Sequence, residues 1–276
     1  MSTPIRLNSN RAFIVGGYSH VNPAEFSDHI NFFDSVSMLL QYRYRMNPSY
    51  ALRDNEANLL NLPTWDEQRR ATYQGDISYV THSGLIVAEL THPSTGTGQE
   101  LQSAADNGIP VIALMRGEEG KRVDITYAVR NNDHGAEEGF KLTRGVGGIS
   151  KMADGNPAII ARLPYGTYSE ALRKLDKVLQ EKFGLVPESK KYLEAASIEE
   201  KSGNVEKASE LKRKARLIDN LLEFKPEENR PKKYEKEFPH NERLPLEDVE
   251  WELKKNPSHK REPQSGEVTK HVRKTT

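Results

Sequence analysis

A short polar stretch, "HPSTGTGQE" at residues 92–100, holds the residue types in this sequence that are best suited to chemistry. It follows the apolar run "GLIVAEL" and precedes "LQSAADNGIPVIAL", which predicts a turn between a strand and a helix. The main-chain amides of residues 96–99 and the helix dipole could together bind an anion such as a phosphate group. Glu100 is expected in the first helical turn, where the dipole would keep its carboxylate ionised. An ionised carboxylate beside a sugar can attack the anomeric carbon or stabilise a positive charge there.

The same stretch also fits an ordinary helix cap, in which Glu100 only complements the dipole of its helix. Spacing alone does not separate these two interpretations, because a single glycine-rich turn is a weak motif. A ligand site at this turn requires that it lie at the carboxyl end of a strand in a parallel sheet. The elements on either side are therefore part of the prediction.

Four apolar runs predict the strands of a parallel sheet. Each run is nearly continuous and is bounded by glycine, proline or polar residues, as is typical of strands that are covered on both faces. The runs are "AFIVGG" (12–17), "GLIVAEL" (84–90), "PVIALM" (110–115) and "AIIARL" (158–163).

Amphipathic segments between these runs predict helices. Apolar side chains recur at helical spacing from Phe26 to Leu40, and "TWDE" (64–67) and "TYSE" (167–170) match the capping box that begins many helices. Gly184 stands where the last helix of this region should end. Strands that alternate with helices indicate an α/β fold, a Rossmann-like or flavodoxin-like sandwich around a parallel sheet.

The composition divides the chain into four regions. Residues 1–10 are polar and are predicted to be flexible, and residues 11–186 hold the α/β domain. Residues 187–224 predict a helical hairpin that turns at Gly203 and packs on the domain or on a second subunit. Residues 225–276 are rich in Lys, Glu and Pro and are expected to be disordered.

Composition also excludes several classes of function. The chain has 40 basic and 40 acidic residues, so no net field would attract a nucleic acid polymer or an anionic membrane. It has no cysteine, which rules out disulfides, thiolate metal sites and a cysteine nucleophile, and it has no apolar run as long as a membrane span. The histidines lack metal-binding spacing, and neither a metal nor another cofactor is expected. We predict a soluble, cytoplasmic protein.

Residues 75–116 resemble the nucleoside 2-deoxyribosyltransferase superfamily, and most of all its nucleoside 5'-monophosphate N-glycosidases, which include 2'-deoxynucleoside 5'-phosphate N-hydrolases and CMP hydrolases. In that family an Asp on a helix is followed by a strand ending in Ala-Glu-Val or a similar triplet, and then by Pro-Ser-x-Gly-x-Gly-x-Glu. The flanking elements extend the resemblance over about residues 11–184. The matching residues occur here in the same order and spacing: Asp76, "VAEL" (87–90), Pro93, Ser94, Gly96, Gly98 and Glu100.

The resemblance implies hydrolysis of the N-glycosidic bond of a nucleoside 5'-monophosphate without a cofactor. Glu100 matches the carboxylate that attacks or stabilises C1' of the ribose, and Asp76 matches the acid that protonates or orients the leaving base. Ser94 matches the hydroxyl that binds the 5'-phosphate, next to Gly96 and Gly98. Without the resemblance, Asp76 would be interpreted as a solvated charge on the surface of its helix.

The turn after the first strand departs from the family pattern. The family has Tyr-x-x-Gly followed by Ser, an apolar residue and Arg, whereas this chain has Phe13 and Ser19 at the positions of the Tyr and the Arg. Gly16, Gly17 and Tyr18 are still expected to contact the substrate. Other residues could supply the missing charge; the candidates are His20, Arg116, Lys121 and Arg122.

Members of the family act as homodimers in which a hydroxyl of the neighbouring subunit reaches the phosphate, so the resemblance implies a homodimer here. Residues 123–133, "VDITYAVRNND", occupy the corresponding region, and Thr126 is the candidate hydroxyl, with Asp124 as the alternative. Thr126 could instead lie on an ordinary amphipathic helix with Ile125 and Val129 in the core.

Two other functions fit the same residues. A nucleoside deoxyribosyltransferase would keep water away from the intermediate and pass the sugar to another base. A non-catalytic nucleotide sensor would bind the nucleotide and dock a partner through the hairpin at 187–224, and the altered first turn favours this alternative.

Overall fold

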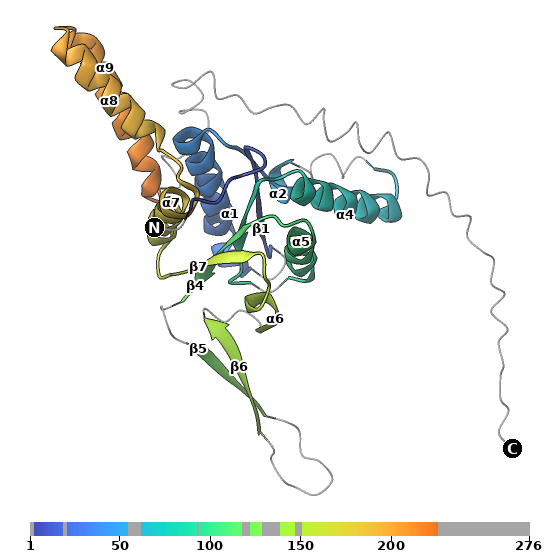
Figure 1. Ribbon diagram of the computed structural model, residues 1–276. Coiled ribbons are helices and arrows are strands. Elements are labelled where there is room, and N and C mark those ends of the chain that lie inside the picture. The colour runs from blue at the N-terminus through green and yellow to red at the C-terminus, as the bar shows by residue number, and fades with distance from the viewer. Residues whose placement is uncertain are drawn as a thin grey trace, which may run out of the picture. The chain divides into compact units, whose positions relative to one another are not determined.

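The structure, a computed structural model, describes residues 3–18, 21–54, 62–92, 94–117, 122–128, 139–146 and 151–225 (Figure 1). Apart from Lys225, the tail that was predicted to be disordered lies outside these residues. Residues 3–10 form neither helix nor strand, although the N–H of Ile5 donates to the carbonyl of Lys182 at 2.8 Å. Of the helices in the described ranges, none has both the length and the apolar composition needed to cross a membrane.

Five parallel strands form the central sheet, in the order β2-β1-β3-β4-β7 (Figure 1). The four predicted strands are confirmed and end close to their expected limits. Almost all of their residues are buried, which agrees with the nearly continuous apolar runs. The four are β1 (Arg11–Gly16), β3 (Leu85–Glu89), β4 (Val111–Arg116) and β7 (Ile159–Tyr165).

Helices cover both faces of this sheet, as the predicted sandwich requires (Figure 1). One pair is α1 (Pro23–Met38) and α7 (Tyr168–Phe183), and the other is α4 (Trp65–Thr81) and α5 (Thr95–Asp106). Alternate side chains of each strand pack into these two layers. In β1, Ile14 belongs to the core beneath α1 and α7, whereas Phe13 stacks on Tyr79 of α4 with ring centroids 5.1 Å apart.

The capping residues act as the sequence predicted. The hydroxyls of Thr64 and Thr167 begin α4 and α7 by accepting the N–H groups of Glu67 and Glu170, each at 3.2 Å. Gly184 ends α7 with a φ of 65°, in the left-handed region that favours glycine.

The fifth strand, β2 (Asn47–Tyr50), was not predicted. Its sequence, "NPSY", has no apolar run and contains a proline, which is tolerated at a sheet edge because one side of an edge strand needs no ladder hydrogen bonds. In the described sheet β2 lies at that edge and pairs with β1. A short helix, α2 (Ala51–Asp54), follows it.

The order of connections places a topological switch point at the carboxyl ends of β1 and β3, where sheets of this kind have their ligand crevice. From β1 the chain passes through α1 to β2 on one side, and from β2 it passes through α4 to β3 on the other side of β1. Loops that leave adjacent parallel strands in opposite directions open a space between them, and ligands of such sheets bind there. The polar turn at 92–100 follows β3 and therefore lies at this crevice.

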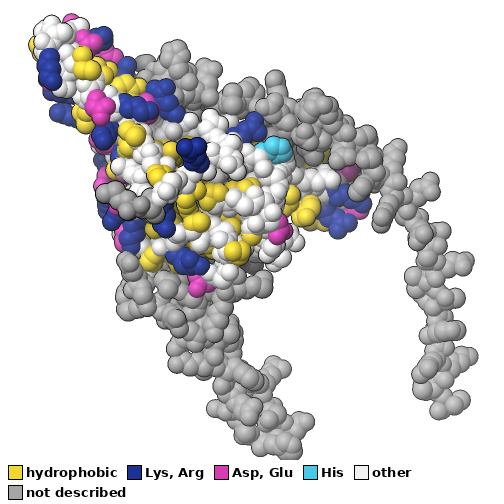
Figure 2. All heavy atoms as spheres, in the orientation of Figure 1, with side chains coloured by type: hydrophobic (Ala, Val, Ile, Leu, Met, Phe, Trp, Pro, Cys, Tyr) yellow, Lys and Arg dark blue, Asp and Glu magenta, His cyan; other side chains and the backbone are white. Residues whose placement is uncertain are grey.

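The predicted helical hairpin is confirmed as α8 (Glu188–Lys201) and α9 (Val205–Asp219), followed by a 3-10 turn, η2 (Asn220–Leu222). Figure 2 shows basic and acidic side chains interspersed along its visible face. The hairpin packs on the α/β domain, where Ile218 and Leu221 share a buried apolar cluster with side chains of the α1 segment.

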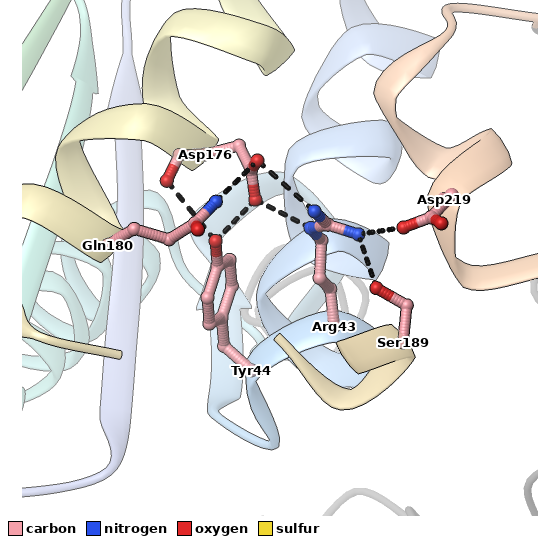
Figure 3. A network of polar contacts seen from close by, with 6 residues as sticks. All are labelled: Arg43, Tyr44, Asp176, Gln180, Ser189 and Asp219. Carbon is pink, nitrogen blue, oxygen red and sulfur yellow. Dashed lines mark hydrogen bonds and ion pairs between the residues drawn. The ribbon is translucent and has the colours of Figure 1, made fainter. Parts of the chain in front are cut away.

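Arg43 joins the hairpin to the domain by buried polar contacts (Figure 3). It belongs to η1 (Leu39–Arg43), a π-helical turn that continues α1. Its Nε donates to Oδ1 of Asp176 in α7 at 2.5 Å. Its Nη1 donates to Asp219 of α9 at 2.5 Å and to Ser189 of α8 at 3.1 Å. One guanidinium therefore holds three separate helices.

An antiparallel pair occupies the irregular region after β4. It consists of β5 (Arg122–Ala128) and β6 (Gly139–Val146), and a short helix, α6 (Lys151–Asp154), follows. Thr126 pairs with Lys141 in this ladder, so the alternative that placed Thr126 on an amphipathic helix is wrong. The β-branched residues of "RVDITYA" favour a strand over a helix.

Candidate active site

Two glycines at the end of β1 form one wall of the candidate site. Gly16 pairs in register with Glu89, and a Cβ added to Gly16 would lie 2.6 Å from Cζ of Phe33. A Cβ added to Gly17 would lie 2.6 Å from the carbonyl oxygen of His92. Such distances are steric clashes, so only glycine lets the end of β1 approach the turn after β3 this closely. Both predicted contact residues are thus placed at the crevice.

Tyr18, the third predicted contact residue of this turn, packs on the α1 side of the crevice. Its ring centroid is 5.1 Å from that of Phe33 and 6.2 Å from that of His29. The next two residues, Ser19 and His20, lie outside the described residues, as does Lys121.

Ser94 caps the N terminus of α5. Its Oγ accepts the N–H of Thr97 at 3.4 Å, and its carbonyl accepts the N–H of Gly98 at 3.1 Å. The helix therefore begins at Thr95, earlier than expected. The prediction that the amides of Thr97 and Gly98 would face an anion is wrong, because both already donate to Ser94. The N–H groups of Thr95 and Gly96 precede the first intrahelical bond. Since Ser94 Oγ accepts in this cap, its own hydrogen can be donated to a ligand.

Glu100 lies in the second turn of α5 and is 8% exposed. Burial, and secondarily the charge of Asp76, raises the pKa of Glu100 to about 8. The prediction of an ionised Glu100 in the first helical turn is therefore wrong for the protein without substrate. The dipole field falls off within the first turn, and desolvation of the carboxylate is the larger effect.

Asp76 comes from α4, on the same face of the sheet as α5. Its charge acts on Glu100 and also on Tyr79, one turn further along α4. The structure thus brings together the two carboxyl groups that the sequence singled out. Their environments differ, because Glu100 is almost fully buried whereas Asp76 is partly exposed. Paired acids in unlike environments are the usual arrangement for acid–base chemistry.

Phe13, which stands where the family has Tyr, is fully buried against Tyr79. Its ring keeps the shape of the wall next to α4, but position 13 supplies no hydroxyl. The departure seen in the sequence is therefore a loss of one hydrogen bond with no loss of packing.

Glu89 is a buried acid at the crevice whose role the sequence did not reveal. It ends β3 with 1% exposure, and its Oε1 accepts the N–H of Thr91 at 3.2 Å, the hydroxyl of Tyr165 at 3.0 Å and the hydroxyl of Thr91. Its Oε2 has no hydrogen-bond partner among the described residues. Burial raises the pKa of Glu89, although these hydrogen bonds and Arg116 oppose the shift. A glutamate that ends the apolar run "LIVAE" was the available signal.

His29 and Arg116 lie on the same side of the crevice as Glu89. His29 is 2% exposed, and burial, with smaller contributions from His92 and Arg116, lowers its pKa to about 4. The imidazole is therefore neutral at physiological pH. Arg116, a candidate for the missing family charge, reaches the crevice at the end of β4, and its guanidinium donates to Glu25 at 3.1 Å.

Within the described parts of the chain, no group of three or more His, Asp or Glu side chains is arranged to hold a metal ion. The side chain of Thr126 is not among those described, and its proposed reach into a neighbouring subunit stays a prediction.

Comparisons of the sequence identify two curated relatives, although no protein-family model matches the chain. The chain is 35% identical over 66 residues to a 5-hydroxymethyl-dUMP N-hydrolase of Tetraodon nigroviridis, which is 24% of this chain and 45% of that protein. It is 35% identical over 49 residues to a protein of the same name from Rattus norvegicus, which is 18% of this chain and 30% of that protein. The chain thus spans less than half the length of either relative.

Among solved structures, a CMP N-glycosidase of Clostridium botulinum overlaps 61% of this chain and 99% of its own, with 15% identity and a TM-score of 0.35. That overlap is too weak to carry an argument. The curated relatives, in contrast, are both named as N-hydrolases of a nucleoside monophosphate. They confirm the sequence resemblance of this chain to the nucleoside 5'-monophosphate N-glycosidases.

Proposed function

We propose that this protein hydrolyses the N-glycosidic bond of a nucleoside or deoxynucleoside 5'-monophosphate and releases the free base and the sugar 5-phosphate. The observation that carries the proposal is Glu100, a buried acid in the second turn of α5. The charge of Asp76, on α4, contributes to its raised pKa. The position of Glu100 at the β1–β3 crevice and the names of the curated relatives support the same reaction.

The phosphate would bind at the start of α5. There the N–H groups of Thr95 and Gly96 and the hydroxyl of Ser94 can donate to its oxygens, and the positive end of the helix dipole favours the negative charge. Holding the remote phosphate places C1' of the sugar against the next turn of the helix. Binding energy from a non-reacting group is then used to orient the reacting one.

The two acids would carry out the bond exchange. Glu100, once ionised, attacks C1' while the C1'–N bond breaks and its electron pair leaves with the base. Asp76 in its protonated form gives a proton to the departing base. Water then attacks C1', Asp76 takes the proton of that water, and the Glu100 carboxylate is released. Neither step requires a metal ion.

The proposal is tested by incubating the protein with ribo- and deoxyribonucleoside 5'-monophosphates and with the matching nucleosides, and separating the products by chromatography. We expect free base from monophosphates only. Glu100→Ala should lower turnover at least about 1000-fold while nucleotide binding persists, because the attacking group is lost and the phosphate site is kept.

Asp106→Asn provides a matched control, since Asp106 is an exposed acid on the same helix whose Oδ1 accepts from Gln102 at 2.8 Å. It should keep full activity. An active Glu100→Ala variant would refute the mechanism. Transfer of the sugar to an added base would identify a transferase, and stabilisation by nucleotides without release of base would identify a nucleotide sensor.

A further inference from the structure

Asp76 has a closed side and an open side along α4. Its neighbours one turn further along the helix, Tyr79 and Val80, are buried, with 9% and 0% exposure. Its neighbours one turn earlier, Thr72 and Tyr73, are both exposed, and Tyr73 is 57% exposed. A ligand that contacts Asp76 therefore has room to extend over Thr72 and Tyr73.

The open side of Asp76 is directed toward the carboxyl edge of the sheet. The helix α4 ends at Thr81, just before β3 begins at Leu85, so it runs antiparallel to the strands. Its N-terminal part approaches the edge at which the crevice lies, and α5 begins at the same edge because it follows β3. Tyr73 thus lies about 5 Å along the helix axis toward the crevice from Asp76.

Tyr73 presents an aromatic ring that the fold itself does not use. On the buried side of the same helix, Tyr79 stacks on Phe13 of β1 with ring centroids 5.1 Å apart. Tyr73, in contrast, forms no hydrogen bond and no ring contact with another described residue. A tyrosine ring is flat and rigid, and nucleobases stack on such rings.

We propose that the ring of Tyr73 stacks on the base of the bound nucleotide. This inference rests on the proposed function, in which Asp76 gives a proton to the departing base and must lie within hydrogen-bonding reach of it. A base held at Asp76 extends over the open side of that residue, where the ring of Tyr73 lies. Stacking grows with the area of the base, so the contact should contribute more to the binding of purine nucleotides than of pyrimidine nucleotides.

Calorimetry in a Glu100→Ala background measures the contact without turnover. The ligands are AMP, GMP, CMP, UMP and ribose 5-phosphate, which has no base. Adding Tyr73→Ala should raise Kd about tenfold for AMP and GMP and less for CMP and UMP, and should leave Kd of ribose 5-phosphate unchanged. Unchanged Kd values for all four nucleotides would overturn the inference. It would also be overturned if no nucleotide bound more tightly than ribose 5-phosphate, because the base would then add nothing.

Two further variants separate stacking from a general effect on the helix. Tyr73→Phe keeps the ring and should restore most of the affinity that Tyr73→Ala loses. Trp65, at 75% exposure, is another exposed aromatic residue of α4, but it lies about 12 Å from Tyr73 along the helix axis. Trp65→Ala should therefore leave every Kd unchanged. If it weakened nucleotide binding as much as Tyr73→Ala does, stacking on Tyr73 would be excluded.

Failure of the inference and failure of the proposed function give different results. Release of base by the unmodified protein, with the same kcat/KM in Tyr73→Ala, would retain the function and remove the contact. Tighter binding of AMP than of ribose 5-phosphate, lost in Tyr73→Ala but seen without release of base from any nucleotide, would retain the contact and remove the reaction.

Discussion

Arg43, beneath the helical hairpin, and Glu100, in the second turn of α5, are buried to almost the same degree, with 6% and 8% exposure. The charges next to them differ: Arg43 has neighbours of opposite charge, and Glu100 has a neighbour of the same charge. Arg43 faces carboxylates on two helices, Asp176 and Asp219, whereas the charge that acts on Glu100 is that of another acid, Asp76. The Asp176 carboxylate also accepts the hydroxyl of Tyr44 and the side-chain amide of Gln180 (Figure 3).

This difference distinguishes a charged residue that stabilises the fold from one that is suited to catalysis. Removing one member of a buried, hydrogen-bonded pair leaves the other uncompensated, so the Arg43 contacts act as a single unit that holds the hairpin. At Glu100 the nearby charge has the same sign, so it helps to raise the pKa of Glu100. The carboxyl group can then gain or lose a proton near neutral pH. Residues of equal burial thus serve stability in one region and reactivity in the other.

The largest expected effect is on stability, from Arg43→Met. The substitution leaves Asp176 buried without its cation, and the free energy of unfolding should fall by about 3–5 kcal/mol. Chemical denaturation measures this change. Lys177→Met is the control, since Lys177 forms an exposed ion pair with Glu181 at 3.8 Å and its loss should change stability by less than about 0.5 kcal/mol. Similar losses in both variants would mean that burial of the pair does not matter.

The next effect is the dependence on pH, which concerns Glu100. The proposed reaction needs Glu100 ionised while Asp76 carries a proton. The pair of acids loses its last proton with a pKa of about 8, so kcat/KM should fall about tenfold per pH unit above pH 8. The pH profile of kcat/KM checks this, because it reports the free protein. A profile that stays flat or rises from pH 7 to pH 9 would show that the reaction does not use a proton held by these two acids.

The raised pKa of Glu100 also predicts how the free energy of unfolding depends on pH. The folded protein binds the Glu100 proton more tightly than the unfolded chain, so this contribution to the free energy of unfolding is greatest below about pH 4.5 and is lost as the pH rises to about 8. Glu100→Gln should lack this loss. Comparing the two proteins from pH 5 to pH 9 isolates Glu100 from other groups such as His29.

The smallest effect is expected from Ser94→Ala, which tests the phosphate end of the site. The hydroxyl is one of several donors there, so KM for nucleoside monophosphates should rise about tenfold while kcat changes little. Part of the change would come from the lost helix cap, and an unfolding experiment measures that part separately. An unchanged KM would remove Ser94 from the phosphate site.

Local signals in the sequence predicted most of the elements. Capping boxes at Thr64 and Thr167, a glycine stop at Gly184 and the hairpin turn at Gly203 each depend on a few neighbouring residues, and each was found where expected. The strand β2 was missed because "NPSY" carries no hydrophobic pattern of its own. It forms because β1 offers it an unpaired edge, which is a property of the assembled sheet.

For the site, the sequence by itself determined which residue types stand at the turn after β3: a capping serine, glycines that permit close approach, and a glutamate on the following helix. Only the tertiary structure decided their chemical state. Glu100 is protonated at neutral pH because folding removes it from water and brings Asp76 beside it. The hydrogen bonds of Glu89 fall on one oxygen because Thr91 and Tyr165 are brought beside it. Desolvation and hydrogen bonding depend on residues that are distant in the chain, so no local pattern encodes them.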